Sequence, residues 1–157
     1  MREKLDTIDL RLLKELRRNC KQRISRLSSK LAVPRSTLHN RMKKLERIGV
    51  IRRYIAIPNF EKIGLPLTAY VHIVITSRES ADEIARRLAA MPNVEEVAIV
   101  TGQFDIIAKV RFKNTKELGE FIFGKKRGLR SWNGVERTET MVALSTVKEY
   151  GLQSQGE

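Results

Sequence analysis

The amino-acid sequence predicts an α+β protein in two modules. This prediction rests on the distribution of charge along the chain and on the spacing of its apolar residues. Residues 1–60 show helical spacing of apolar positions and hold 17 Lys or Arg against 5 Asp or Glu. Residues 61–157 hold 14 basic and 13 acidic residues, and β-branched runs alternate there with amphipathic segments. Because nearly all of the net charge of +13 lies in the first module, we expect that module to meet a polyanion.

The composition is typical of a protein with a hydrophobic core and excludes several other classes. Hydrophobic residues make up 41% of the 157-residue chain, no apolar run approaches the roughly 18 residues that span a bilayer, and the N-terminus lacks the apolar region of a signal peptide. The single cysteine, Cys20, cannot form an internal disulfide, and we expect it to be partly buried. With two well-separated histidines, His39 and His72, the sequence lacks the spacing of a metal site. We therefore expect a cytoplasmic protein with no metal, no cofactor and no membrane partner.

Three short helices are predicted in the first module. Asp6 precedes an apolar-periodic run and caps a helix over residues 7–19. A second helix fits residues 24–31, and a third begins near Pro34, whose ring suits a first helical turn, and stops before Gly49. Short helices joined by a tight link are the outline of a helix-turn-helix unit.

A β-branched run at residues 50–57 predicts a strand, which serves as a wing or as a hinge. Pro58, Gly64 and Pro66 then mark the connection to the second module. The expected division of the chain is a helix-turn-helix domain over 1–52, a strand or hinge linker over 53–66, a C-terminal domain over 67–150 and a tail over 151–157.

The second module is predicted to have the order βαββαβ. This order is the ferredoxin-like split βαβ motif, in which two helices cover one face of the sheet. The other face usually meets a partner, so we expect a homodimer. The predicted elements are a strand at 67–75, a helix at 81–91 that Ser80 caps, strands at 94–100 and 106–112, a helix that Thr115 caps, and a strand at 135–147.

The predicted third helix has one apolar and one polar face. Leu38, Met42 and Leu45 recur at helical spacing and point inward. The rest of the helix supplies the candidate DNA contacts, which are Arg35, Ser36, Thr37, His39, Asn40, Arg41, Lys43, Lys44 and Arg47.

The chemistry of these candidates divides them by role. Ser36, His39 and Asn40 lie near the helix start, where side chains reach base edges in the major groove. A solvated helix face is the alternative, but the two preceding helices and the charge of the module favour DNA. Cations farther along the helix suit phosphates, and these are Lys43, Lys44 and Arg47.

Four segments together resemble the Lrp/AsnC family of transcription regulators. They are LDTIDLRLLKELRRN, SSKLAVPRSTLHNRMKKLERIGVIRRYIAI, MPNVEEVAIVTGQFDIIAKV and GVERTETMVALSTVKEY, and they extend from Leu5 to Tyr150. The resemblance implies an N-terminal (winged) helix-turn-helix domain and a C-terminal RAM domain (regulation of amino-acid metabolism), which forms dimers through its sheets. It also implies an octamer built from dimers and a free amino acid bound between them. The 31% of charged residues favours an archaeal or thermophilic source.

The resemblance places the effector site near the turn TGQFD, which comprises Thr101, Gly102, Gln103, Phe104 and Asp105. A glycine at positive φ leaves backbone N–H groups exposed, and these could bind an α-carboxylate. Asp105 could accept hydrogen bonds from an α-ammonium group. Glycine and aspartate are also ordinary turn residues, so a turn without a ligand stays open as the alternative.

Two residues depart from the family pattern. Pro34 stands where many members have a capping Ser or Thr, and we expect Ser36 or Thr37 to compensate in part. Ala32 stands where glycine is frequent, so we expect the turn before the third helix to avoid a left-handed residue.

The segment GKKRGLRSWNG, residues 124–134, is a basic loop between the last predicted helix and the last strand. One interpretation is a solvated loop, and the other is contact with wrapped DNA or with a neighbouring dimer. We expect Trp132 to be a packing residue.

The sequence as a whole predicts a sequence-specific DNA-binding transcription regulator that an amino acid modulates. An architectural DNA-binding protein without an effector is the alternative from the same residues. The sequence offers no nucleophile–base pair and no phosphate-binding glycine loop, so we do not expect an enzyme. RNA binding is disfavoured because the first module offers only Tyr54 and Phe60 for base stacking.

Overall fold

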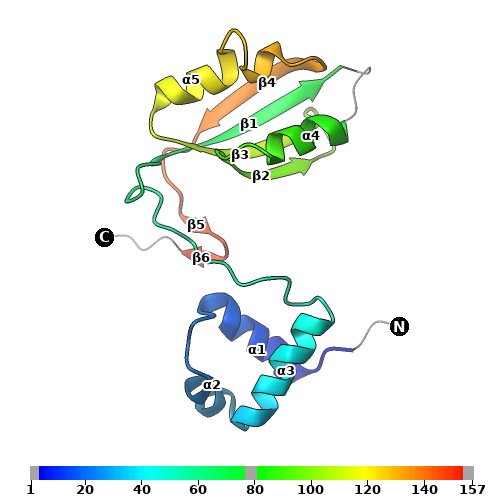
Figure 1. Cartoon of the computed structure of the whole chain (residues 1–157), viewed down its shortest axis with the longest axis vertical. Helices are drawn as coiled ribbons and strands as arrows, with labels where there is room; N and C mark the ends of the chain where they lie inside the picture. Colours follow the sequence, from blue (N-terminus) through cyan, green and yellow to red (C-terminus); the bar gives the residue numbers. More distant parts are fainter. Residues whose placement is uncertain (1–3, 77–80, 154–157) are drawn as a thin grey trace. The chain divides into compact units, whose positions relative to one another are not determined.

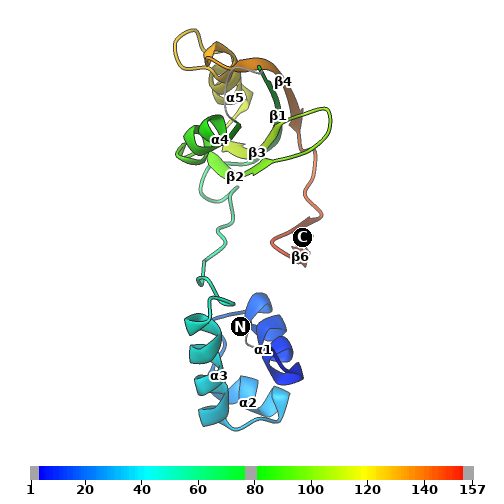
Figure 2. The same cartoon turned by 90° about the vertical axis from the view of Figure 1, so that its right-hand side faces the viewer.

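The computed structural model describes residues 4–76 and 81–153 of the chain. The chain divides into two compact units, one comprising Met1–Ile57 with Val147–Glu157 and the other Pro58–Thr146. Each unit has its own secondary structure (Figure 1, Figure 2). The predicted α+β fold, with helices first and an antiparallel sheet with helices second, is confirmed.

Leucines from all three helices form the core of the first unit. Leu12, Leu27, Leu38 and Leu45 are each at most 1% exposed. Burying one such side chain contributes about 2 kcal/mol, and this packing stabilises helices that are too short to be stable alone. The helices are α1 (Thr7–Arg18), α2 (Ile24–Leu31) and α3 (Arg35–Arg47).

Helix α1 begins with a reciprocal cap. The Asp9 N–H donates to the Asp6 carboxylate at 2.8 Å, and the Asp6 N–H donates to the Asp9 carboxylate at 3.2 Å. This capping box satisfies backbone donors at the helix start and confirms the predicted cap. Because α1 ends at Arg18, Cys20 falls in the following loop and is exposed, which corrects its expected partial burial.

The turn between α2 and α3 corrects a second expectation. Ala32 takes left-handed backbone angles, φ 54° and ψ 45°, whereas the sequence predicts that this turn avoids a left-handed residue. Leu31 and Val33 on either side are both buried, and the reversal at Ala32 lets both reach the core. The Val33 N–H donates to the Ser28 carbonyl at 3.2 Å and closes the turn. Packing therefore imposes a conformation that costs an alanine about 1 kcal/mol.

Residues 50–57 do not form the predicted strand in the part of the chain that the structure describes. The Ile51 N–H donates to the Leu45 carbonyl at 3.0 Å, and the Tyr54 hydroxyl donates to the Glu46 carboxylate at 2.8 Å. A strand needs hydrogen bonds from a neighbouring strand, and a β-branched composition alone does not supply that neighbour. In the same unit, short strands β5 (Lys148–Glu149) and β6 (Leu152–Gln153) pair with each other.

The second unit is a four-stranded antiparallel sheet with the strand order β2-β3-β1-β4. The central strands pair along their length, from Leu67 opposite Phe112 to Ile73 opposite Ile106. Their order along the chain is the predicted βαββαβ. The elements are β1 (Leu67–Ile75), α4 (Ala81–Ala89), β2 (Val94–Ile99), β3 (Ile106–Phe112), α5 (Thr115–Phe123) and β4 (Val135–Val142).

The last strand of this sheet is shorter than predicted. Strand β4 ends at Val142 rather than at residue 147. The Ala143 N–H still donates to the Thr68 carbonyl at 2.9 Å, but β1 itself begins at Leu67. Past that point β4 has no residue of β1 left to pair with, so the ladder ends.

The two helices of this unit also differ slightly from prediction. Asn114 rather than Thr115 caps α5, because the Glu117 N–H donates to Asn114 Oδ1 at 2.9 Å. Helix α4 ends at Ala89 instead of residue 91. Ser80, its predicted cap, lies outside the described residues.

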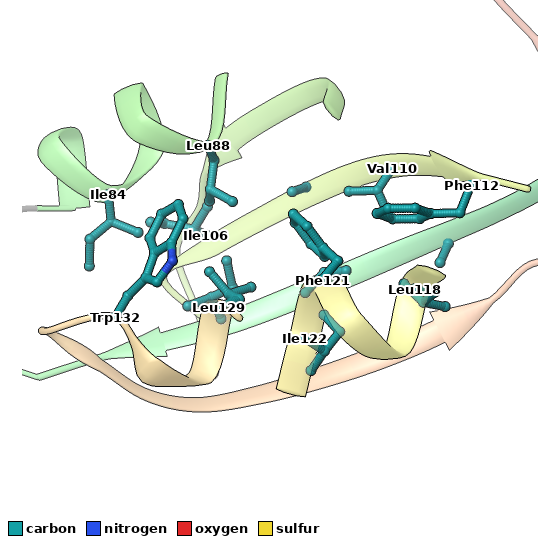
Figure 3. Close-up of a cluster of buried hydrophobic side chains, with 14 residues drawn as sticks. Ile84, Leu88, Ile106, Val110, Phe112, Leu118, Phe121, Ile122, Leu129 and Trp132 are labelled. Carbon is teal, nitrogen blue, oxygen red and sulfur yellow. The ribbon is translucent and has the colours of Figure 1, made fainter. Parts of the chain in front are cut away.

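The core of the second unit lies between the sheet and its two helices (Figure 3). Ile84 and Leu88 of α4 and Ile122 of α5 are at most 4% exposed. Trp132 lies beside Ile84 and is 7% exposed, so its predicted packing role is confirmed. The strands alternate buried and partly exposed residues, so the helices cover one face of the sheet.

The other sheet face carries a histidine with an unsatisfied nitrogen. The His72 ring lies 4.8 Å from the Phe104 ring, measured between centroids. His72 Nδ1 is buried, and among the described residues it has no hydrogen-bond partner. A buried polar atom of this kind costs free energy unless something satisfies it.

We predict that Ala32→Gly raises the free energy of unfolding by about 1 kcal/mol, because glycine adopts left-handed angles without the steric cost of a Cβ atom. Urea and thermal unfolding followed by circular dichroism would measure the change. Gly49→Ala is a matched control, since Gly49 has φ +72° and nothing within 4 Å of an added Cβ atom. It should lower the free energy of unfolding by a similar amount. An Ala32→Gly variant no more stable than the parent would contradict the left-handed turn.

Candidate DNA interface and candidate effector turn

The start of α3 presents backbone donors to its surroundings. Pro34 is the N-cap residue, and α3 has no side-chain cap hydrogen bond, so the compensation expected from Ser36 or Thr37 is not formed at this described helix start. The Leu38 N–H donates to the Pro34 carbonyl at 3.0 Å and closes the first turn. The preceding N–H groups lie at the positive end of the helix dipole, where anions such as phosphates bind.

The outward face of α3 carries most of the candidate contacts. Its inner face is anchored by Leu38 and Leu45, which are both fully buried. Most of the polar side chains opposite them are solvent-accessible. The exposed candidates are Arg35, Ser36, His39, Asn40, Lys43 and Arg47, and Thr37 is half-buried.

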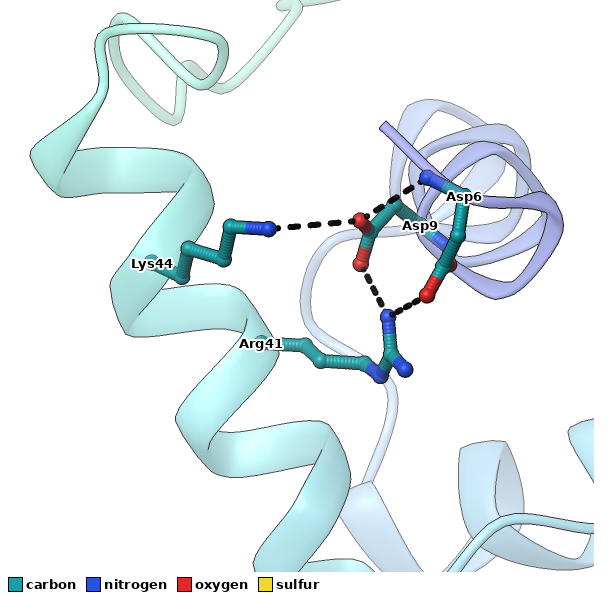
Figure 4. A network of polar contacts seen from close by, with 4 residues as sticks. All are labelled: Asp6, Asp9, Arg41 and Lys44. Atoms are coloured by element: carbon teal, nitrogen blue, oxygen red, sulfur yellow. Dashed lines mark hydrogen bonds and ion pairs between the residues drawn. The ribbon is translucent and has the colours of Figure 1, made fainter. Parts of the chain in front are cut away.

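Two candidates are instead directed toward α1 (Figure 4). Arg41 Nη1 donates to Asp6 Oδ2 and to Asp9 Oδ1, each at 2.6 Å. Lys44 Nζ lies 3.9 Å from Asp9 Oδ2. The Asp9 side chain is 0% exposed and that of Arg41 is 23% exposed. Arg41 and Lys44 therefore hold α3 against α1.

The charges in this network stabilise one another. The backbone N–H of Asp9, followed by the Arg41 guanidinium, lowers the pKa of Asp6. Hydrogen bonds to Asp9 and then to Asp6 raise the pKa of Arg41. Both acids look like ordinary helix-capping residues in the sequence, and Arg41 lies 35 and 32 residues away from them. One signal was present: Arg41 follows Leu38 by three positions, which places it beside the inner face of the helix.

Hydrogen bonds hold the turn at residues 101–105 to the end of β1. The Asp105 N–H donates to the Ile73 carbonyl, and the Asp105 carboxylate accepts from the Ile75 N–H, both at 2.9 Å. The Val100 N–H donates to the Asp105 carbonyl, also at 2.9 Å. The Asp105 carboxylate thus has a structural role that the sequence pattern did not indicate.

The remaining turn residues divide by exposure. Gly102 has φ +121°, so its predicted positive φ is confirmed. Thr101, Gly102 and Gln103 are exposed, whereas Phe104 is 9% exposed. The exposed part of the turn can therefore present backbone N–H groups to a carboxylate, and the buried part anchors it.

Two surface hollows lie elsewhere in the second unit, and neither includes residues 101–105. Within the described ranges, no group of three or more potential metal-ligating side chains is found. No helix in that part of the chain has the length and apolar character of a membrane span. The first of the two surface hollows is lined by Asp82, Ala85, Arg86, Ala89, Val97 and Ile99. The other is lined by Met91, Phe112, Glu117, Glu120, Phe121, Gly124, Lys125, Lys126 and Arg127.

Two protein-family models match the chain. Residues 5–52 match a winged helix-turn-helix DNA-binding domain, and residues 68–152 match the Lrp/AsnC ligand binding domain. An uncharacterized HTH-type transcriptional regulator of Pyrococcus horikoshii is 42% identical over 155 residues, covering 95% of this chain and 99% of the relative. The HTH-type transcriptional regulator FL11 of Pyrococcus abyssi is 38% identical over 149 residues, covering 95% of each protein.

Solved structures with the same fold include two further regulators. A transcriptional regulator from Neisseria meningitidis, solved as a complex with L-Met, is 26% identical with a TM-score of 0.86, over 93% of this chain and 94% of that chain. AsnC of E. coli is 20% identical with a TM-score of 0.81, over 94% of this chain and 97% of that chain. At 20% identity, the similarity to AsnC of E. coli shows a shared fold and nothing more.

We predict that Arg41→Met lowers the free energy of unfolding by about 2 kcal/mol, because the buried Asp9 carboxylate loses its closest cation and keeps Lys44 at 3.9 Å. Urea unfolding at neutral pH would measure this loss. Arg35→Met removes an exposed arginine from the same helix and should change the stability by no more than about 0.5 kcal/mol. Equal changes in the two variants would show that the network does not hold α3.

Proposed function

The chain belongs to the Lrp/AsnC family of transcription regulators, and we propose that it regulates transcription by placing the first half of α3 in the major groove of duplex DNA. The observation that carries this proposal is the division of α3 by face. Its leucines and Arg41 face the other helices, while Ser36, His39 and Asn40 are exposed beside an uncapped helix start. A helix N-terminus with short polar side chains is suited to base edges and phosphates. We propose no catalytic activity for the chain.

The exposed side chains have different proposed roles. Asn40 can pair with an adenine edge through its amide, and Ser36 and His39 can donate to or accept from neighbouring bases. Lys43 and Arg35 are exposed cations that suit phosphates and fix the register of the helix on the duplex. Arg41, which the sequence alone groups with these contacts, is proposed to position the helix rather than to bind DNA.

We further propose that the chain acts as a homodimer through the open face of its sheet. In support, this face carries His72, whose buried Nδ1 lacks a hydrogen-bond partner among the described residues. An exposed apolar side chain also occurs on this face, since Met141 of β4 pairs with Tyr70 of β1 and is 49% exposed. A dimer would present two recognition helices to two half-sites about one helical turn apart, or a multiple of that.

A free amino acid is the proposed effector, bound at residues 101–105. The exposed N–H groups around Gly102 support binding of the α-carboxylate, and Asp105 would contribute negative charge toward the α-ammonium group. The Neisseria regulator that resembles this chain was solved with L-Met. An architectural DNA-binding protein without an effector is the second candidate, and ligand binding distinguishes the two.

We predict that Asn40→Ala abolishes the preference for an operator, selected from random DNA, over unrelated DNA. Lys43→Ala should weaken binding to both and reduce the slope of log K against log salt by about one. Fluorescence anisotropy at several salt concentrations would measure both effects. Lys14→Ala, on the exposed surface of α1, is the matched control and should leave the slope unchanged. If neither Asn40→Ala nor Lys43→Ala affects DNA binding, α3 is not the recognition helix.

We predict that calorimetry against the twenty amino acids detects binding heat for at least one of them. Asp105→Asn should abolish that heat, because the amide still accepts from the Ile75 N–H but carries no charge for the ammonium group. Asp82→Asn, an exposed carboxylate on α4, is the control and should leave the heat unchanged. An absence of heat and of thermal stabilisation with all twenty would favour the architectural protein.

A further inference from the structure

The chain between α5 and β4 carries a dense cluster of positive charge. Residues 121–135 contain four cations and no acidic residue. Without these four, residues 61–157 would hold 10 basic residues against 13 acidic ones. The cluster therefore gives an otherwise acidic module one strongly positive surface. The cations are Lys125, Lys126, Arg127 and Arg130.

These cations are exposed, and they have no ion-pair partner within 4.0 Å among the residues that the structure describes. Glu117 and Glu120 line the hollow beside the loop, yet neither lies within that distance of a loop cation. Elsewhere in the same unit, Arg137 lies 3.9 Å from Glu139. The positive charge of the loop is thus not neutralised by any carboxylate that the structure describes.

The backbone of the loop is held in one conformation. The Gly128 N–H donates to the Gly124 carbonyl at 2.8 Å, which closes the turn that carries Lys125, Lys126 and Arg127. A Cβ atom at Gly128 would lie 2.8 Å from the backbone carbon of Phe123, so the closure requires glycine. A turn that is already ordered loses little conformational entropy when its side chains bind a ligand.

Packing beneath the loop adds to this order. The short 3-10 helix η1 (Leu129–Ser131) follows the turn, and Leu129 is fully buried. The Ser131 hydroxyl donates to the Gly128 carbonyl at 2.7 Å, and Trp132 Nε1 donates to the Arg127 carbonyl at 3.4 Å. Trp132 lies in the core beside Ile84 (Figure 3), so the turn is fixed to the domain.

Two arginines beside the loop lie on aromatic rings. The Arg87 guanidinium lies 3.6 Å from the centroid of the Trp132 ring, and Arg87 is exposed. The Arg130 guanidinium lies 5.5 Å from the ring of Phe123, which is 64% exposed. Cation–π contact keeps these side chains at the surface of the cluster without neutralising their charge.

We propose that this surface, residues 124–130 together with Arg87, binds phosphates of duplex DNA and forms a second DNA contact besides α3. The proposal rests on the proposed function, since it takes DNA as the ligand. Duplex DNA fits because it offers closely spaced phosphates and requires no matching shape, whereas a protein partner would need a concentrated acidic patch. Once α3 is bound, the same duplex is present at high effective concentration, so even a weak second contact adds to the affinity.

Salt-dependent binding of the full-length chain tests this proposal. The probe is a fluorescent random-sequence duplex several helical turns long, and the variant is Lys125→Ala/Lys126→Ala/Arg127→Ala. The slope of log K against log salt should fall by about 2.7 if all three side chains contact phosphates, since each phosphate contact contributes about 0.9. The control, Lys62→Ala/Lys113→Ala/Lys116→Ala, removes the same charge from exposed positions of the same unit, and its slope should stay within about 0.5 of the parent slope.

The other outcomes overturn the proposal. Equal slopes for the loop variant and the control would show that the loop contributes only net charge. An unchanged slope with an altered sedimentation coefficient would assign the loop to contact between copies of the chain. Lys43→Ala, measured in the same series, separates this proposal from the role of α3. If Lys43→Ala leaves the slope unchanged while the loop variant lowers it, the α3 assignment fails and the loop assignment stands.

Discussion

The ion pair between the buried Asp9 carboxylate and the Arg41 guanidinium fixes the rotation of α3, and the face that we propose for DNA binding depends on that rotation. Contacts between leucines are non-directional, so the burial of Leu38 and Leu45 constrains the rotation of α3 less than a directional ion pair does. The Asp9 carboxylate is 0% exposed and must keep Arg41 as its partner. An unpaired buried charge costs far more free energy than a displaced leucine side chain. With Arg41 directed at α1, the residues on the opposite side of α3 face outward.

The two units use charge differently. In the first unit, basic residues are distributed over α1, α2 and α3, and pairs such as Lys30 with Glu15, 2.5 Å apart, link the helices. In the second unit, four cations lie close together between α5 and β4, three of them on a turn that ends in a buried glycine. The charges of the first unit link its helices, and we propose that the exposed ones on α3 also bind DNA. The four cations between α5 and β4 are exposed and contribute nothing to the hydrophobic core.

The sequence predicts those features that depend on local periodicity. The helices α1 to α3 and the central strands β1 and β3 were placed within a few residues, because their apolar spacing matches how each is buried. Features that depend on contacts between residues far apart in the sequence cannot be predicted from local periodicity. Arg41 finds its partners 32 and 35 residues away, and Ala32 becomes left-handed because the residues on both sides of it must be buried. The run at 50–57 has strand composition, but the described structure contains no neighbouring strand for it.

The division of α3 into a packed side and an exposed side has an evolutionary consequence. Ser36, His39 and Asn40 contribute nothing to the leucine core and make none of the hydrogen bonds to Asp6 and Asp9. Mutations at these three positions can therefore accumulate after gene duplication without unfolding the domain. Under the proposed function, such mutations would give a duplicated copy new target promoters while it inherits the rest of the scaffold intact.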